Sequence, residues 1–195
     1  MEEKLLGDNI TDAYNTVTAV AALEEFGLTA DAISRSFEKM QIAGTRFGCV
    51  EVNGRKIITD VAKGQNPIAV SRVCDFVRHE PGKKAVVLIL DDYFDRQDSS
   101  ENIAWFFDTD FEFLNDPGIT QIVVGGPRCM DMHLRLLMAG IPEEKIICCD
   151  EEPDTEKYVD LNKAEHVYIL HDIYTTQYAR AIQKNLGEHL KKEGR

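Results

Sequence analysis

Four short apolar runs, each set between stretches of helical periodicity, constrain the fold of this chain more than any other feature. The runs cover residues 84–90 (KAVVLIL), 120–126 (TQIVVGG), 145–150 (KIICCD) and 166–172 (HVYILHD). Strands that are buried on both faces have this composition in parallel sheets. Alternation of such strands with helices is typical of a doubly wound α/β domain. The sequence therefore predicts a Rossmann-like, mostly parallel sheet flanked by helices.

The helices of this domain are predicted from apolar residues at helical spacing. They are expected over residues 66–79, 128–140, 154–163 and 174–192. Residues 46–61, before the first of them, contain two β-rich runs joined by Asn53-Gly54, a strong signal for a type I′ β-hairpin.

The first forty residues have a different pattern. Residues 13–26 and 29–40 show helical spacing, and Gly27 between them is a candidate C-cap. We expect a helical hairpin within residues 1–42 and the α/β domain over residues 43–195, because 195 residues suffice for one domain with an appendage.

The charge balance limits the partners of the protein. The formal net charge is -12, which argues against nucleic acid and anionic membranes as ligands and is compatible with a basic partner. No apolar run approaches a membrane span, and the acidic N-terminus has no secretory signal. The five cysteines include no C-x-x-C pair, and adjacent Cys148 and Cys149 read as small buried residues of a strand. We expect a cytoplasmic protein with reduced thiols and no metal site.

Polar residues at the carboxyl ends of the strands are the first candidate site. In open α/β sheets, ligands bind at this edge. Asp60, Lys63 and Asn66 lie between a β-rich run and a helix, where a plain connection needs no lysine or carboxamide. His171 and Asp172 end the last predicted strand, but no G-x-S-x-G nucleophile motif accompanies them.

Two arginines near these ends have two interpretations each. Gly125 and Gly126 precede Arg128 at a strand–helix turn, which suits either an anion cradle or an ordinary tight turn. Arg46 lies at the seam between the helical hairpin and the α/β domain, where it suits either phosphate binding or pairing with a surface carboxylate. The chain has neither a Walker A motif nor a G-x-G-x-x-G motif.

The segment 91–114 combines many acidic residues with the single tryptophan, Trp105. Long loops that carry their own hydrophobic side chains are often functional. Trp105, Phe106 and Phe107 form either an exposed docking patch or a short helix packed on the sheet. We predict that residues 91–112, including Trp105, Asp108 and Asp110, dock a partner protein.

Several of these stretches resemble the Mur ligase family, in particular its MurT-type members. AYNTVTAVAALEEFGL (13–28) resembles the Y-N-A-L-A-A helix that closes the central ATPase domain, and GTRFG (44–48) resembles the G-R-(M/F) signature that opens the C-terminal domain. AKGQNPIA (62–69) resembles A-K-N-P-A-G. NIAWFFDTDFE (102–112) and VVGGPRCMDMHLRL (123–136) resemble two further motifs of the MurT-type C-terminal domain, of which the tryptophan motif is the most specific.

The resemblance implies roles in ATP binding for five residues. Asn15 would lie near the adenine, whereas Arg46, Asp60, Lys63 and Asn66 would belong to the face that closes over ATP and substrate. Lys63 would contact a phosphate or carboxylate. ATP and Mg²⁺ are implied for the full-length enzyme, and we expect no cofactor for the isolated chain.

The resemblance also implies a partner. In MurT-type subunits of lipid II isoglutaminyl synthase, the acidic residue three positions before the tryptophan completes a Cys–His–acid triad with a class I glutaminase. Asn102 stands at that position here, with Glu101 beside it. An asparagine can still orient a histidine by hydrogen bonding.

The chain departs from the family in what it lacks. A P-loop, the central-domain carboxylates and a cysteine-rich zinc ribbon are missing from the sequence. We therefore expect either a C-terminal fragment, inactive alone, of a ligase that amidates the D-glutamate of lipid II, or a stand-alone, non-catalytic module that docks a glutaminase or another protein.

Overall fold

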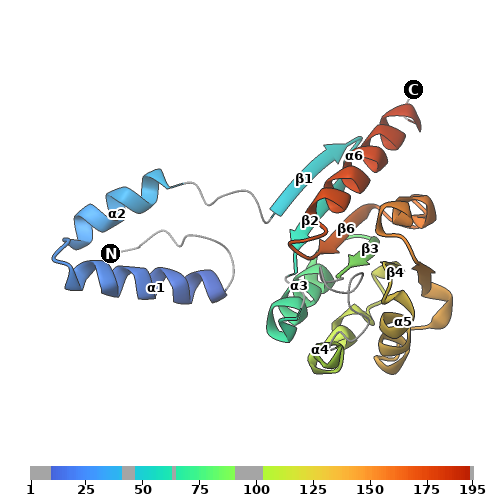
Figure 1. Cartoon of the computed structure of the whole chain (residues 1–195). Coiled ribbons are helices and arrows are strands. Elements are labelled where there is room, and N and C mark those ends of the chain that lie inside the picture. Colours follow the sequence, from blue (N-terminus) through green and yellow to red (C-terminus); the bar gives the residue numbers. More distant parts are fainter. Residues whose placement is uncertain (1–9, 41–46, 63–64, 91–102, 194–195) are drawn as a thin grey trace. The chain divides into compact units, whose positions relative to one another are not determined.

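The computed structural model describes residues 10–40, 47–62, 65–90 and 103–193. By its internal contacts the chain divides into two compact units, Met1–Thr45 and Arg46–Arg195, each of which is described by itself (Figure 1).

The first unit is the predicted helical hairpin. Helices α1 (Ile10–Glu25) and α2 (Ala30–Lys39) are joined at Gly27, whose φ of +85° is the left-handed conformation common at helix C-termini. The Thr29 side chain caps α2 by accepting a hydrogen bond from the Ala32 N–H. Ile33 and Phe37 are buried in this unit.

The second unit is built on one six-stranded sheet in the order β1-β2-β6-β3-β4-β5. β1 pairs antiparallel with β2, and every other neighbouring pair is parallel, which confirms the predicted mostly parallel sheet. The strands are β1 (Phe47–Val52), β2 (Arg55–Val61), β3 (Lys84–Ile89), β4 (Ile119–Gly125), β5 (Ile146–Cys149) and β6 (His166–His171).

The edge of the sheet is the predicted β-hairpin. Asn53 and Gly54 have φ values of +53° and +77°, the two positive values that a type I′ turn requires. Gln183 holds the hairpin against the last helix, because its amide donates hydrogen bonds to the carbonyls of Gly48 and Ile57.

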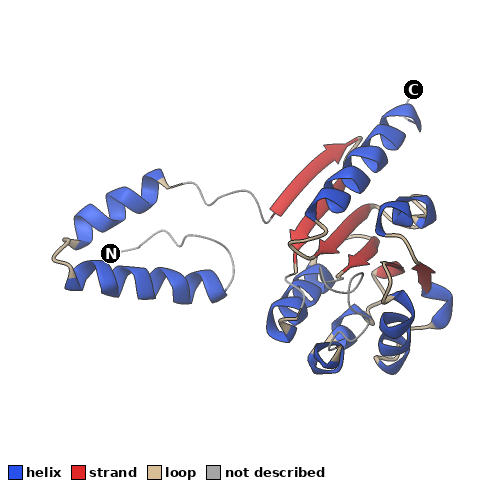
Figure 2. Ribbon diagram, viewed as in Figure 1, coloured by secondary structure: helices blue, strands red, loops and turns tan. Residues whose placement is uncertain are grey.

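Helices cover both faces of the sheet (Figures 1 and 2). One face carries α3 (Pro67–His79), α4 (Ala104–Asp108), the 3-10 turn η2 (Phe111–Leu114) and α5 (Cys129–Met138). The other carries η4 (Glu152–Tyr158) and α6 (Thr176–Glu193), and a 3-10 turn, η3 (Glu143–Lys145), precedes β5. Side chains of β3 alternate between the two cores, with Leu88 in one and Ile89 in the other. None of the helices in the described ranges combines the length and apolar character needed to cross a membrane.

The prediction of a helix over residues 154–163 is wrong. A 3-10 helix, η4, ends at Tyr158 and irregular backbone follows. Gln121, buried in β4, satisfies this backbone by donating to the Tyr158 carbonyl and accepting from the Asp160 N–H. The groups that an α-helix would have paired are thus paired across the core instead.

Candidate functional site

The carboxyl ends of five parallel strands lie along one edge of the sheet, as the sequence predicted. The register places His171 of β6 between Val61 of β2 and Ile89 of β3, and Gly125 of β4 beside Cys149 of β5. The described residues at these strand ends therefore share one rim.

Asn66 has a structural role at this rim. Its side chain accepts a hydrogen bond from the Ala69 N–H at 3.1 Å and so caps α3, with Pro67 as the first helical residue. The preceding residue, Gln65, has a φ of +62°, which is uncommon without glycine. Asp60 is half-buried near the end of β2. The cap explains the carboxamide at position 66.

His171 and Asp172 are part of the folded core. The Nδ1 atom of His171 lies 2.7 Å from the Asp172 carbonyl, and burial lowers the pKa of the imidazole. The Thr175 hydroxyl accepts from the Asp172 N–H and donates to the Ile89 carbonyl. This network closes the turn before α6 and makes His171 part of the folded core rather than an open site.

The turn after β4 favours the tight-turn interpretation over an anion cradle. A Cβ atom on Gly125 would lie 2.3 Å from Cγ2 of Thr155, and Gly126 has a φ of +107°. Both glycines therefore have steric or conformational reasons to be there. The Arg128 guanidinium lies 3.8 Å from the Asp131 carboxylate, and among the described residues it is the one charged side chain lining a small hollow formed by β3, β4, α4 and α5.

The cysteines near this turn are not activated. Burial raises the pKa of Cys129 to about 12, and burial also raises the pKa of Cys148 and of Cys149. Among the described residues, no three His, Cys, Asp or Glu side chains are grouped so that they could hold a metal ion. The described part of the rim therefore offers neither a thiolate nucleophile nor a metal centre.

The tryptophan segment packs as a short helix, α4, against the same face of the sheet. Trp105 meets the Phe106 ring edge-on, with ring centroids 4.4 Å apart, and Phe106 is fully buried. Phe107 faces outward and is 49% exposed. Phe106 thus anchors the helix, whereas Trp105 is only partly buried against the core and Phe107 points outward.

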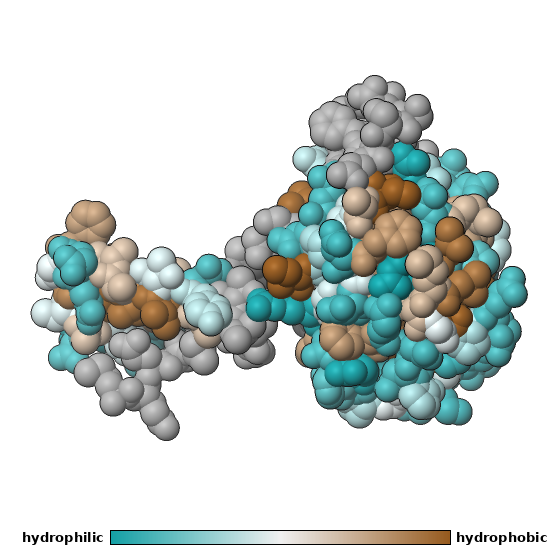
Figure 3. Space-filling model, turned by 90° about the horizontal axis from the view of Figure 1, so that it is seen from below, coloured by the Kyte–Doolittle hydropathy of each residue, from teal (hydrophilic) through white to brown (hydrophobic). Residues whose placement is uncertain are grey.

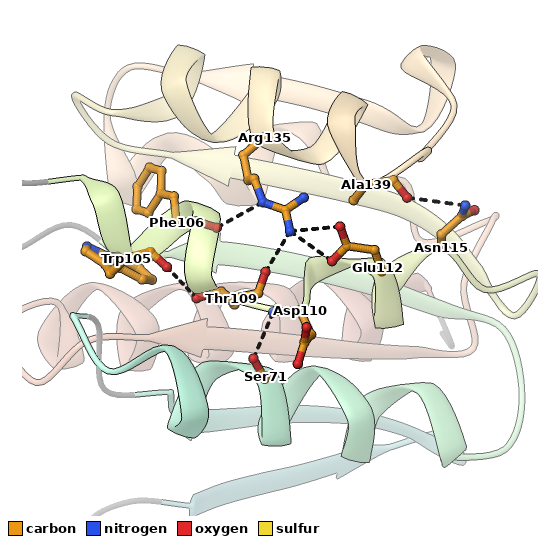
Figure 4. A network of polar contacts seen from close by, with 9 residues as sticks. All are labelled: Ser71, Trp105, Phe106, Thr109, Asp110, Glu112, Asn115, Arg135 and Ala139. Atoms are coloured by element: carbon orange, nitrogen blue, oxygen red, sulfur yellow. Dashed lines mark hydrogen bonds and ion pairs between the residues drawn. The ribbon is translucent and has the colours of Figure 1, made fainter.

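A buried arginine holds this segment in place (Figure 4). Arg135 of α5 donates hydrogen bonds to the carbonyls of Phe106 and Thr109, at 2.9 and 2.7 Å. Its Nη2 atom also lies 2.9 and 2.8 Å from the two carboxylate oxygens of Glu112. We call this network the Arg135 clamp. It satisfies two buried carbonyls and joins α4 and η2 to α5.

The other side of the segment is tied to α3. The Asp110 N–H donates to the Ser71 hydroxyl at 2.8 Å, and the Thr109 hydroxyl donates to the Trp105 carbonyl. The backbone is thereby fixed while the carboxylate-bearing residues Asp108 and Asp110 remain exposed. The segment presents acidic groups on a rigid base.

Of the other predicted site residues, Asn15 alone lies in the described part of the chain. Asn15 is exposed on α1, in the first unit. Arg46, Lys63, Glu101 and Asn102 lie outside the described residues.

The comparison with protein families decides the assignment. The MurT ligase C-terminal family matches residues 64–176, more than half of the chain. This chain belongs to the MurT ligase C-terminal family.

Two curated relatives agree. The MurT subunit of lipid II isoglutaminyl synthase (glutamine-hydrolyzing) from Streptococcus pneumoniae is 27% identical over 158 residues, which are 80% of this chain and 34% of the relative. The subunit of the same name from Staphylococcus aureus strain COL is 30% identical over 157 residues, with the same two shares. This chain thus spans about a third of the length of these relatives.

The fold is that of Mur ligases. A crystal structure of MurF from Acinetobacter baumannii matches 92% of this chain and 38% of its own chain, with a TM-score of 0.64 and 17% identity.

Within this MurT-type domain, the Arg135 clamp joins two stretches that are distant in sequence. Glu112 ends the tryptophan motif, and Arg135 lies near the end of the GGPRCMDMHLRL stretch. Reasoning from the sequence missed both residues as partners. The available signal was an arginine set among leucines and methionines in a short, mostly apolar helix that follows an acidic motif in the sequence.

The clamp predicts a specific pH dependence of stability. Hydrogen bonds from Arg135 lower the pKa of Glu112, so the ionised carboxylate stabilises the folded state. This contribution is complete above the pKa of an unfolded glutamate, about 4.3, and is lost as the pH falls through the lowered folded pKa.

The test is urea unfolding at pH 7 and in this acid range. Wild type should lose up to about 1 kcal/mol more than Glu112→Gln, a modest value because the carboxylate is half exposed. Arg135→Met, which lacks the hydrogen-bond donor, should show the same smaller loss of stability in acid as Glu112→Gln. Equal acid losses for wild type and Glu112→Gln would contradict the role of the pair.

Proposed function

We propose that this chain is the C-terminal domain of a MurT-type ligase subunit. With a glutaminase partner, the subunit would amidate the D-glutamate of lipid II in the cytoplasm, during peptidoglycan synthesis. The observation that carries the proposal is the family match over residues 64–176. The two relatives named as subunits of lipid II isoglutaminyl synthase support it.

In this proposal the chain contributes one wall of the ligase site. ATP would activate the D-glutamate α-carboxyl as an acyl-phosphate, which ammonia then attacks. Arg46 and Lys63 are suited to contact phosphate or carboxylate groups because both carry a positive charge. Asp60 and Asn66 would belong to the same face as Lys63, and Asn15 would lie near the adenine. Alone, the chain would be inactive.

Mg²⁺ is assigned no ligand in this chain. Within the described part of the chain, no three carboxylate, imidazole or thiolate side chains are grouped so that they could hold a metal ion.

The ammonia would come from glutamine hydrolysed by the partner. Asn102, with Glu101 beside it, would approach the catalytic histidine of the glutaminase and orient it by a hydrogen bond. The tryptophan segment, with Trp105, Asp108 and Asp110, would hold the two proteins together. Its anchored backbone and exposed carboxylates support this part of the proposal.

The proposal is tested by Trp105→Ala in a binding assay with the glutaminase subunit encoded in the same genome. We expect affinity to fall about tenfold or more, as is common when an aromatic side chain of an interface is truncated. Isothermal titration calorimetry measures the change, and circular dichroism checks that the sheet and helices are retained.

Tyr158→Ala is the matched control. Tyr158 is an aromatic residue that is 45% exposed on η4, which packs against the opposite face of the sheet, so its removal should leave affinity unchanged. Absence of binding by the wild-type chain would overturn the proposed function. Unaltered affinity of Trp105→Ala would refute the docking role of the segment.

A further inference from the structure

Helix α5 has an inverted distribution of polar and apolar side chains. Its arginine, Arg135, is buried, whereas Met130, Leu134 and Met138 are 64%, 56% and 62% exposed. A surface helix ordinarily places its apolar stripe toward the core and its charges toward water. Here one apolar face, including Met132 and Leu136, is buried, and a second apolar face points outward.

The exposed residues form one stripe. Met130, Leu134 and Met138 are spaced four residues apart, so their side chains lie above one another along the helix, with Leu137 at the side. We call these four residues the α5 stripe. Brown and tan surface gathers over the region of α5 in the view of this side of the molecule (Figure 3). Contiguous exposed apolar surface of this kind marks interaction sites, and methionine adapts readily to a partner.

The helix that carries the stripe packs beside the tryptophan segment. α4 packs against α5 through the hydrogen bond from Arg135 to the Phe106 carbonyl. The next residue, Phe107, is half exposed. The α5 stripe and the proposed docking segment therefore lie on neighbouring helices that cover the same face of the sheet.

Acidic groups border this surface. Asp108, Asp110, Glu112 and Asp131 lie on α4, the turn after it, η2 and α5. The sequence from residue 103 to residue 140 contains no lysine. Its two arginines are engaged, because Arg135 is buried in the clamp and Arg128 lies 3.8 Å from Asp131. The border is therefore negative, in keeping with the net charge of -12.

We propose that the α5 stripe is the apolar centre of the surface that binds the glutaminase subunit, and that the partner offers an apolar groove edged by lysine or arginine. This inference rests on the proposed function and extends it from the tryptophan segment to α5. A second copy of this chain is a poor occupant, because two acidic borders would face each other. A buried apolar centre with a charged rim is the usual anatomy of such an interface.

The test uses Leu134→Gln/Met138→Gln in the same calorimetric assay with the glutaminase subunit. Both side chains are exposed and glutamine favours helices, so the fold should be retained. We expect affinity to fall about tenfold or more. Tyr158→Gln, on the opposite face, should bind like wild type. Asp108→Lys should weaken binding and reduce its dependence on salt, because a basic partner edge would then meet a like charge.

Each outcome has a distinct meaning. Binding by wild type with equal affinity of the double variant overturns the α5 inference and leaves the proposed function intact. No binding by wild type overturns the proposed function and the inference with it. Self-association of the chain in sedimentation velocity that the double variant abolishes would assign the stripe to a second copy and refute the inference.

Discussion

Replacing Arg135 with methionine is expected to lower the free energy of unfolding by about 3 kcal/mol, because buried carbonyls left without a donor cost roughly 1–3 kcal/mol each. Two carbonyls, those of Phe106 and Thr109, accept from this side chain inside the protein. Methionine fills much of the volume but donates no hydrogen bond. The Glu112 carboxylate also loses its partner, a smaller effect because it reaches solvent. Urea unfolding followed by circular dichroism measures the loss.

Two further variants separate the charge of Arg135 from its geometry. Arg135→Lys keeps the charge but cannot reach both carbonyls and the carboxylate at once, so it should recover only part of the stability. Arg180→Met, on the exposed face of α6, should stay within about 0.5 kcal/mol of wild type. A change of less than 1 kcal/mol for Arg135→Met would show that the clamp is not a major source of stability.

The sheet could be predicted from the sequence because its signals are local. Each buried strand is a short apolar run. Asn53-Gly54 specifies the type I′ turn between β1 and β2 through the backbone preferences of these two residues alone. The helix predicted over residues 154–163 failed for a non-local reason. Gln121, more than thirty residues away, pairs with the backbone there, and no pattern within residues 154–163 reveals it.

The candidate site was likewise predictable only where its signals are local in the sequence. Parallel topology predicts that the carboxyl ends of the strands share one edge of the sheet. The Asn66 cap could be predicted too, because Asn-Pro stands directly before an apolar helix. The clamp did not follow, because an arginine in an amphipathic helix normally faces water. The α5 stripe was not predicted either, because an arginine that faces water would place these apolar side chains elsewhere. With Arg135 turned inward, Leu134 and Met138 are turned outward, and only the structure shows which face of α5 is buried.

Gly125→Ala is expected to cost roughly 3 kcal/mol, at the upper end of the effects of overpacking. The added Cβ would lie 2.3 Å from Cγ2 of Thr155 and 2.9 Å from Cγ2 of Ile89. Both neighbours are fully buried, so neither can move into solvent. Gly125 does not have a positive φ, so the cost is one of space rather than of backbone strain. Chemical unfolding of the purified chain measures it.

A second substitution identifies the cause. Thr155→Ser removes the nearest methyl group and keeps the hydroxyl that donates to the Glu152 carbonyl, so Gly125→Ala/Thr155→Ser should be more stable than Gly125→Ala. Gly187→Ala is the matched control. Its Cβ would meet other atoms no closer than 3.8 Å, and alanine favours the α6 helix, so stability should be unchanged or slightly higher. If Gly125→Ala retained full stability, close packing would not explain the glycine, and the anion-cradle interpretation of the turn would again be favoured.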